Sequence, residues 1–305
     1  MKKFFSLALL FVYVMIIPVF FTGCSCEKEP ELVVKHHETY VSYTDLSYGD
    51  HERQKLNLHI PKNKTGEVGL MLLIHGGGWK AGDKSAYDST LVDWCGTKGY
   101  VAAAINYRYA GGDTYVGDIL NDITSSMLKI KEVAAEYNIS VTKAMLCGGS
   151  AGAHLSLMYA YSKADIAPIA PVAVVSYAGP TDLTDANFYE DKDNRDDIID
   201  MISCVSGYSF DMSSLTQALP FLKQASPVSY ITEDTVPTLI CHGENDDIVP
   251  YSNAMILKNK LDAVGVRNNL VTFPNSGHGL DSDKDSAINS IANDLILEYA
   301  NTYLD

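Results

Sequence analysis

The sequence predicts an α/β fold with a doubly wound, mainly parallel sheet that carries helices on both faces. Three observations support this class. Short apolar runs alternate with longer segments of helical periodicity from residue 68 to the C-terminus. A chain of 305 residues can bury a large core, and α/β folds of this length commonly form one domain. Apolar content of 47% and charged content of 20% are typical of an ordered globular protein.

The N-terminus precedes this domain and has the pattern of an export signal. Lys2 and Lys3 are basic, and an apolar run follows from Phe4 to Phe21. Small residues then precede Cys24, as in a bacterial lipobox, although Phe21 replaces the usual Leu, Val or Ile. An ordinary cleaved secretory signal or an uncleaved anchor is the alternative, and the run is of marginal length for spanning a bilayer.

From this pattern we expect a lipoprotein signal peptide over residues 1–23, lipidation of Cys24 and a polar tether over residues 24–37. A lipidated cysteine would hold the protein at a membrane surface outside the cytoplasm without spanning the bilayer. The α/β domain is then expected over residues 38–305.

Two strands are expected to open the domain, over residues 38–48 and 54–61. The second alternates apolar and polar side chains, as a half-exposed antiparallel strand does. Residues 68–74 are almost continuously apolar, which fits a parallel strand buried on both faces. Strands and helices then alternate, with strands expected at 100–107, 143–147, 172–177, 238–242 and 270–273, and helices at 85–98, 115–137, 151–162, 255–264 and 286–303.

Residues 182–232 interrupt this alternation, because they are far longer than a normal connection between a strand and the next strand. We expect a small cap insertion over the carboxyl edge of the sheet, where ligands bind in such folds. A surface excursion without a role is the alternative. Aromatic and leucine side chains of the insertion are candidates for lining a pocket, namely Phe188, Tyr189, Phe210, Leu219 and Phe221.

Charge and cysteine content exclude some classes of function. The net charge of −15 and the lack of a Lys/Arg cluster beyond the N-terminus argue against nucleic-acid binding. Beyond Cys24 and Cys26, the cysteines are irregularly spaced, and no C-x-x-C pair indicates a metal site. We therefore expect no metal.

The segment Gly148-Gly149-Ser150-Ala151-Gly152 lies between an apolar run and a segment with helical spacing. This context predicts a strand, a sharp turn and a helix, with Ser150 at the apex of the turn. A serine hydroxyl is a weak nucleophile, so it needs a base, and the base needs a group that orients it. A glycine-rich turn without catalytic function is the alternative.

Two further segments supply candidate partners for Ser150. His278 lies in a glycine-flanked loop after a strand, which suits a general base. His75-Gly76-Gly77-Gly78-Trp79 follows a buried strand, and its glycines allow backbone N–H groups to approach a substrate closely. The N–H groups of Gly77, Gly78 and Ala151 are the candidates for an oxyanion hole. His154 is expected to be packed in the fold, and His242 to shape the loop after its strand.

The carboxylate that orients the base should also follow a strand. Glu244, Asp246 and Asp247 all follow the strand that ends at His242, and their positions alone do not choose among them.

These motifs together resemble the α/β-hydrolase esterases over roughly residues 38–303. The resemblance includes the His75–Trp79 loop, Asn106-Tyr107-Arg108 at a strand end, the Ser150 turn, the segment from His242 to Pro250, and Ser276–Gly279. It implies the α/β-hydrolase fold and a catalytic triad of Ser150, Asp246 and His278, with Asp246 as the acid.

Within that superfamily, Gly149 and the run Ala153-His154-Leu155 resemble the carbohydrate-ester deacylases, which include feruloyl and acetyl xylan esterases. Relatives of hormone-sensitive lipase usually carry an acidic residue at the place of Gly149. The resemblance implies a serine carboxylesterase that forms an acyl-Ser150 intermediate, removes acetyl or feruloyl groups from small or oligosaccharide esters outside the cytoplasm, and needs no metal or organic cofactor.

Two alternatives stay open. The same triad could serve an amidase, a peptidase or an aryl formamidase. A glycan-binding lipoprotein with a decayed catalytic site belongs to another class of function, and the presence of every candidate triad residue weighs against it.

Overall fold

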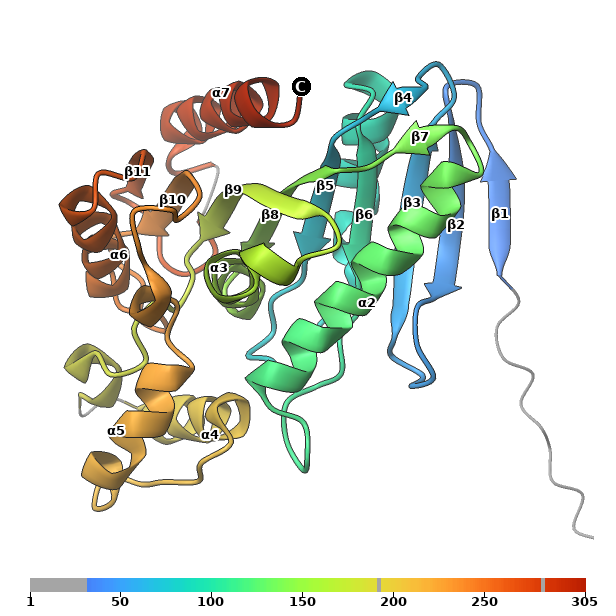
Figure 1. The fold of residues 1–305 in the computed structure, drawn as a ribbon. Coiled ribbons are helices and arrows are strands. Elements are labelled where there is room, and N and C mark those ends of the chain that lie inside the picture. Colours follow the sequence, from blue (N-terminus) through green and yellow to red (C-terminus); the bar gives the residue numbers. More distant parts are fainter. Residues whose placement is uncertain (1–31, 191–192, 281–282) are drawn as a thin grey trace, which may run out of the picture. The chain divides into compact units, whose positions relative to one another are not determined.

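The computed structural model describes residues 32–190, 193–280 and 283–305, and a sheet of nine strands lies at the centre of this part of the chain (Figure 1). Strands β1 (Val33–His36), β2 (Tyr40–Ser47) and β3 (Lys55–Pro61) are antiparallel to one another and form one side of the sheet. β3 is also antiparallel to β6 (Val101–Ile105). The rest of the sheet is parallel to β6 and follows in the order β5 (Leu70–Ile74), β8 (Lys143–Gly149), β9 (Ala170–Tyr177), β10 (Thr238–Gly243) and β11 (Asn268–Phe273).

The N-terminal predictions fall mostly outside the described residues. The signal peptide, Cys24 and residues 24–31 of the predicted tether lie there. Residues 33–36, which the sequence assigned to the tether, instead form β1, and Val33 pairs with Thr44 of β2. The chain therefore enters the sheet before residue 38. No helix in the described part of the chain is both long and apolar enough to cross a membrane.

Helices cover both faces of the sheet, as the sequence predicted. One face carries α2 (Val116–Ala135), α3 (Ala151–Ser162) and α6 (Ser252–Ala263), and the other carries α1 (Asp88–Val92) and α7 (Ser286–Tyr303). The buried strand β5 shows the alternation that this layering requires. Leu70, Leu72 and Ile74 join the core under α2 and α3, whereas Met71 and Leu73 join the core under α1 and α7.

Some local structure differs from the prediction. The helix expected at 85–98 is divided into a 3₁₀ turn, η1 (Lys84–Tyr87), the short α1, and a π-helical turn, η2 (Asp93–Thr97). A separate pair of short strands, β4 (Gly66–Glu67) and β7 (Ile139–Ser140), was not predicted, nor was the turn η3 (Ala164–Ile166). None of these changes the order of the main elements.

The insertion, residues 182–232, contains two helices and two 3₁₀ turns, and we call its described part the cap. Its elements are η4 (Ala186–Tyr189), α4 (Arg195–Ser206), α5 (Leu215–Gln224) and η5 (Pro227–Tyr230). In α4, apolar residues recur at helical spacing, Asp196 and Asp197 suit the helix N-terminus, and Gly207 ends the helix with a φ of 73°. The buried face of α4 joins the core that lies under α2 and α3.

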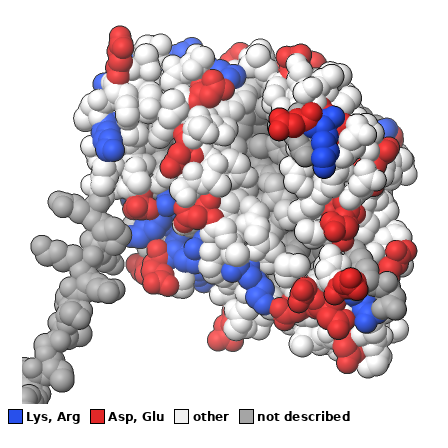
Figure 2. All heavy atoms as spheres, turned by 180° about the vertical axis from the view of Figure 1, so that it is seen from behind, with Lys and Arg blue, Asp and Glu red and all other residues white. Residues whose placement is uncertain are grey.

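The negative charge is distributed over the surface. Figure 2 shows a face on which Asp and Glu side chains are scattered and interleaved with Lys and Arg, with uncharged surface in its middle. Such a distribution contributes to solubility, and it gives no large field of one sign on this face.

Candidate active site

Ser150 lies at the sharp turn between β8 and α3, with a φ of 53° and a ψ of −122°. A non-glycine residue in such a region stores roughly 1–3 kcal/mol of strain. A Cβ atom on Gly152 would lie 1.9 Å from the carbonyl oxygen of Ile74, and one on Gly148 would lie 2.4 Å from the carbonyl carbon of Gly152. The turn therefore requires glycine at both positions. It is held by the Ser150 N–H, which donates to the Tyr177 carbonyl at 2.8 Å.

His278 and Asp246 lie on the loops that follow β11 and β10. His278 Nδ1 donates to Asp246 Oδ2 at 2.8 Å. The other carboxylate oxygen, Oδ1, accepts the backbone N–H groups of Ile248 at 3.0 Å and Val249 at 2.9 Å. His278 and Ser150 line the same cavity. The structure thus brings together the three residues that the sequence proposed as nucleophile, base and acid.

The structure also distinguishes among the three residues that the sequence offered as the acid. The Asp246 side chain is fully buried and contacts His278, whereas Glu244 and Asp247 are exposed. Within the described residues, no group of three or more His, Cys, Asp and Glu side chains could hold a metal ion.

A second histidine contacts Asp246. The Nε2 atom of the buried His242 lies 3.2 Å from Asp246 Oδ2 and donates to the Val249 carbonyl at 3.0 Å. Burial alone would raise the pKa of Asp246, but hydrogen bonds from His242 and His278, the charge of His278 and the Val249 N–H lower it well below its usual range. Asp246 is therefore an anion at neutral pH. From sequence, His242 was expected only to shape the loop.

The predicted oxyanion glycines lie next to the nucleophile. A Cβ atom on Gly76 would lie 2.8 Å from the Gly149 carbonyl oxygen, so the loop after β5 packs directly on the Ser150 turn. Gly77 and Gly78 have φ angles of 107° and 57°, which favour glycine. In the described part of the chain, the N–H groups of Gly77, Gly78 and Ala151 donate to no protein acceptor. They are available to a substrate oxygen.

His75 fixes the beginning of this loop. Its Nε2 lies 3.2 Å from the Arg53 guanidinium, which can only donate, so Nε2 accepts and Nδ1 carries the proton. Nδ1 then donates to the Gly76 carbonyl at 2.8 Å. The His75 ring stacks on Tyr107, whose hydroxyl donates to the His75 carbonyl at 3.1 Å. Burial lowers the pKa of His75 to about 4, so this arrangement is that of a neutral ring.

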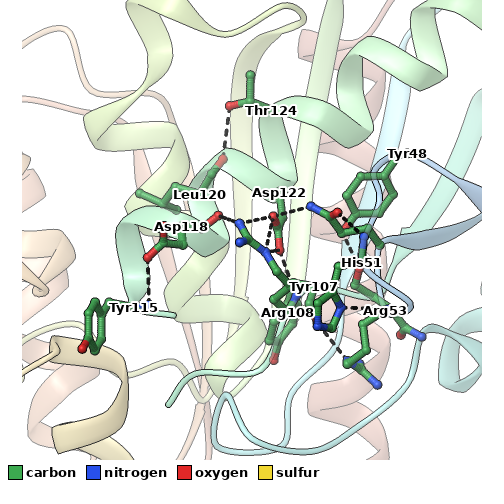
Figure 3. A network of polar contacts seen from close by, with 12 residues as sticks. Tyr48, His51, Arg53, Tyr107, Arg108, Tyr115, Asp118, Leu120, Asp122 and Thr124 are labelled. Atoms are coloured by element: carbon green, nitrogen blue, oxygen red, sulfur yellow. Dashed lines mark hydrogen bonds and ion pairs between the residues drawn. The ribbon is translucent and has the colours of Figure 1, made fainter. Parts of the chain in front are cut away.

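A buried polar network holds the end of β6 on the other side of this loop (Figure 3). The Arg108 guanidinium contacts both oxygens of Asp122 from α2, with the shortest distance 2.7 Å. Gln54 Nε2 donates to the same carboxylate at 2.8 Å, and the Tyr48 hydroxyl donates to the Asn106 carbonyl. This network anchors Asn106-Tyr107-Arg108 to α2 and to the connection between β2 and β3, and so positions the tyrosine that stacks on His75.

Two members of these networks escaped the sequence prediction. Asp122 lies three residues after Ile119 in α2, on the apolar face, and an acidic residue there was the available signal for a buried ion pair. Arg53 lies in a turn, with no periodic pattern to distinguish it from a solvated side chain.

The cavity around Ser150 has a volume of about 690 Å³, which is in the usual range for small-molecule sites. Cap side chains line part of it, namely Leu183, Phe188, Ile198, Met201 and Ile202. Of the five residues predicted to line a pocket, only Phe188 lines this one. Tyr189 and Phe210 pack against each other inside the cap, Phe221 stacks on Tyr208, and Leu219 is exposed.

The cap contacts the oxyanion loop directly. Lys80 Nζ lies 2.6 Å from Asp200 of α4. A Cβ atom on Gly78 would lie 2.2 Å from Met201 Sδ, so the Met201 side chain of α4 packs directly on this glycine.

His154 forms a further link between the loop and the cap. It is fully buried, as predicted, and its Nδ1 accepts from Trp79 Nε1 at 3.1 Å. Its Nε2 therefore carries the proton and donates to the Ala225 carbonyl, at the end of α5, at 2.7 Å. Burial lowers the pKa of His154 to about 4, so the ring is neutral.

Comparison with known proteins gives relatives that include esterases and a formamidase. The model of the BD-FAE family matches residues 56–261. The probable carboxylic ester hydrolase LipM of Mycobacterium tuberculosis is 27% identical over 229 residues, which cover 74% of this chain and 53% of that protein. The kynurenine formamidase of Danio rerio is 29% identical over 133 residues, 41% of each chain. The chain spans about half the length of curated relatives such as LipM.

Solved structures with a similar fold include esterase B of Lactobacillus rhamnosis, with a TM-score of 0.66 and 20% identity over 88% of this chain and 87% of that one. A truncated carbohydrate esterase from gut microbiota has a TM-score of 0.63 and 20% identity, and covers 86% of this chain and 100% of that one. At this identity the likeness concerns the fold, and it confirms the α/β-hydrolase fold predicted from the sequence.

Proposed function

Because the chain belongs to the BD-FAE family, we propose that it is a serine carboxylic-ester hydrolase that acts through an acyl-Ser150 intermediate. One observation carries the proposal: Ser150 and His278 line one cavity, and the buried Asp246 accepts the Nδ1 proton of His278. With Nδ1 occupied in this way, Nε2 of His278 is the atom that accepts a proton from the serine.

The proposed reaction has two halves. Ser150 Oγ attacks the ester carbonyl carbon while His278 Nε2 takes the hydroxyl proton. The carbonyl oxygen becomes an oxyanion and receives the N–H groups of Gly77, Gly78 and Ala151, each donor being worth roughly 3 kcal/mol in the transition state. The bond between the carbonyl carbon and the alcohol oxygen then breaks, and His278 gives its proton to the leaving alcohol.

Water completes the cycle. It attacks the acyl-Ser150 carbonyl while His278 takes one of its protons, and the bond from the carbonyl carbon to Ser150 Oγ breaks. The serine regains the proton from His278, and the carboxylic acid leaves. Asp246 remains an anion throughout and stabilises the imidazolium that forms twice in the cycle.

As substrates we propose carbohydrate esters with an acetyl or feruloyl acyl group. Gly149 and the run Ala153-His154-Leu155 support this class, as does a solved structure of the same fold that is a carbohydrate esterase. We further propose that the enzyme acts outside the cytoplasm, held at a membrane by a lipid on Cys24. Mass spectrometry of the N-terminal peptide tests this: Cys24→Ser should abolish the lipid mass, and a lipidated Cys24→Ser protein would refute the assignment.

A second candidate function is an aryl formamidase on the same triad, because one relative is a kynurenine formamidase. The first step would then release an aryl amine instead of an alcohol. Amide and peptide hydrolysis require the same catalytic groups as ester hydrolysis. Assays with different substrates therefore distinguish the candidate functions.

The test uses the full chain in detergent against p-nitrophenyl acetate, acetylated xylan, methyl ferulate, an aryl formamide and a peptide anilide. We expect ester hydrolysis, and we expect Ser150→Ala to lower kcat/KM on the order of 10⁴-fold or more. Ser162→Ala, at the end of the same helix, is the matched control. A fluorophosphonate should label the wild type at Ser150. Undiminished turnover by Ser150→Ala would refute the nucleophile, and faster formamide than ester hydrolysis would favour the second function.

A further inference from the structure

The side chains that line the cavity around Ser150 fall into two groups with different chemistry. The first group lines what we call the cap chamber and consists of Leu183, Phe188, Ile198, Met201 and Ile202. The second lines what we call the tyrosine chamber and consists of Tyr87, Tyr177, Phe273, Leu280 and Asn289. The cap-chamber residues pack with the core under α2 and α3, whereas Tyr87, Tyr177, Phe273 and Leu280 pack with the core on the opposite face of the sheet. The cavity therefore extends around the carboxyl end of the sheet, with Ser150 between the two chambers.

Hydrogen-bonding groups are confined to the tyrosine chamber. The five cap-chamber side chains carry no nitrogen or oxygen atom. Over the described residues, the Tyr177 hydroxyl and the Asn289 carboxamide have no protein hydrogen-bond partner, whereas the Tyr87 hydroxyl contacts the Ile74 carbonyl at 3.3 Å and the Gly149 backbone. Partly buried polar groups that lack a protein partner are matched by solvent or by a ligand. The cavity thus offers apolar contacts on one side and polar, aromatic contacts on the other.

The catalytic geometry decides which part of an ester enters which chamber. The leaving alcohol oxygen must lie within hydrogen-bond reach of His278 Nε2, because His278 protonates it. Leu280 follows His278 by two residues, and Asn289 lies in the first turn of α7. Asp285, which precedes this helix, accepts the side-chain N–H of Asn275 from the histidine loop at 2.8 Å. The tyrosine chamber is therefore connected to the loop that carries His278, through Leu280 and the N-terminus of α7.

The acyl group is directed the other way. Its carbonyl oxygen lies at the N–H groups of Gly77 and Gly78 in the proposed mechanism, and Met201 of the cap chamber packs directly on Gly78. An acyl chain that continues from this carbonyl carbon meets the apolar residues of α4.

From this partition we propose that the tyrosine chamber is the alcohol subsite and recognises a polyhydroxylated ring, a sugar residue, through Tyr177 and Asn289, while the cap chamber binds the acyl group. The proposal rests on the ester-hydrolase function proposed above. Hydroxyl groups on a sugar can pair with the phenol and the carboxamide, and the aromatic walls suit the apolar faces of a pyranose ring. A small alcohol such as ethanol leaves both polar groups without a partner.

Gly149 is the residue that keeps the tyrosine chamber open. A Cβ atom there would have only one neighbour within 4 Å, the Tyr177 carbonyl oxygen at 4.0 Å, in contrast to the backbone clashes at Gly148 and Gly152. Packing therefore does not require this glycine. Because Gly149 lines the cavity and pairs with Tyr177 across β8 and β9, a side chain at Gly149 would take up space at the chamber.

The test compares two acetate esters that differ only in the alcohol: ethyl acetate and an acetylated methyl xyloside, with acid release followed by pH-stat. The readout is the ratio of kcat/KM for the sugar acetate to kcat/KM for ethyl acetate. We expect Tyr177→Phe and Asn289→Leu each to lower this ratio about 10-fold, as loss of a hydrogen bond to a substrate hydroxyl does. Gly149→Val should lower the ratio further. Asn293→Leu, one turn later on α7 and exposed, is the matched control and should leave the ratio unchanged.

A second series keeps the alcohol constant and varies the acyl chain from ethyl acetate to ethyl hexanoate. Met201→Ala should change the preference for acyl length, and Asn289→Leu should not. An unchanged alcohol ratio in the Tyr177→Phe, Asn289→Leu double variant overturns the proposal, as does an acyl preference that moves with Asn289. A wild type that hydrolyses no ester would instead refute the proposed function. One that hydrolyses ethyl acetate but no sugar acetate would refute the sugar subsite and leave the esterase intact.

Discussion

Replacing Asp246 by asparagine should abolish most activity without disturbing the loop, and the hydrogen bonds of this carboxylate explain why. Oδ1 accepts two backbone N–H groups, from Ile248 and Val249. In Asp246→Asn, only the amide oxygen can occupy that place, because an NH₂ group cannot accept a hydrogen bond. The amide nitrogen must then face His278 Nδ1, where Oδ2 lies 2.8 Å away in the native protein.

The consequence is the wrong tautomer of the base. An NH₂ group that donates to Nδ1 moves the imidazole proton of His278 to Nε2, the atom that should take the proton of Ser150. We expect kcat to fall about 10⁴-fold, which corresponds to roughly 5 kcal/mol of transition-state stabilisation. The two backbone hydrogen bonds survive, whereas the contact of His242 Nε2 with Oδ2 is lost, so the variant should still fold, with a melting temperature lowered by a few degrees.

The assay is the initial rate of p-nitrophenyl acetate hydrolysis at neutral pH, with circular dichroism as the check on folding. Asp247→Asn is the control, because this neighbouring carboxylate is exposed, and its rate should stay within about 2-fold of the native rate. The reasoning is refuted if a folded Asp246→Asn protein keeps more than a tenth of the native rate, or if Asp247→Asn is equally damaging.

Three further predictions concern the surroundings of the triad. Gly152→Ala should fail to fold stably, because its Cβ would lie 1.9 Å from a carbonyl oxygen of β5, whereas Gly149→Ala should melt within a few degrees of the native protein; equal melting curves would contradict this. His154→Leu removes the two hydrogen bonds by which His154 links Trp79 of the oxyanion loop to Ala225 of the cap, so urea denaturation should show a loss of about 2–3 kcal/mol, and an unchanged midpoint would argue against the link. His242→Leu removes one donor to Asp246, whose lowered pKa gives stability that is present above the unfolded pKa and lost as pH falls through the folded pKa. The variant has a higher folded pKa, so the loss still begins near the unchanged unfolded pKa but should be smaller and end at a higher pH; melting temperatures from pH 2 to 7 with the same pH dependence as those of the native protein would exclude it.

The sequence was sufficient for the parallel part of the sheet, because strands such as Leu70–Ile74 are apolar throughout and are separated by helices of clear periodicity. The edge strand Val33–His36 was missed for the opposite reason: all of its residues are exposed, and its place depends on pairing with β2 and not on burial. Four exposed residues show no alternation of buried and exposed side chains, so nothing in the sequence indicated that Val33–His36 joins a sheet.

The site divides in the same way. The Ser150 turn could be predicted because backbone clashes around the turn exclude a side chain at Gly148 and Gly152. This requirement is visible in the sequence as a short glycine motif. The acid could not be chosen locally, since Glu244, Asp246 and Asp247 share one loop and only the fold around His278 distinguishes them. The contact of His242 with Asp246 could not be predicted, because it depends on how the loop after β10 folds back. The two chambers could not be predicted either, because their lining residues come from elements that are far apart in the sequence.

The cap and the oxyanion loop are joined at three points, through Lys80 and Asp200, through Gly78 and Met201, and through the buried His154. This has a consequence for protein engineering. An insertion attached only at its ends could be exchanged for that of a relative to alter specificity, with the catalytic centre left intact. Here a grafted cap that lacks partners for these three points would leave the oxyanion donors misplaced. The transplantable unit is therefore the insertion together with the loop that begins at His75.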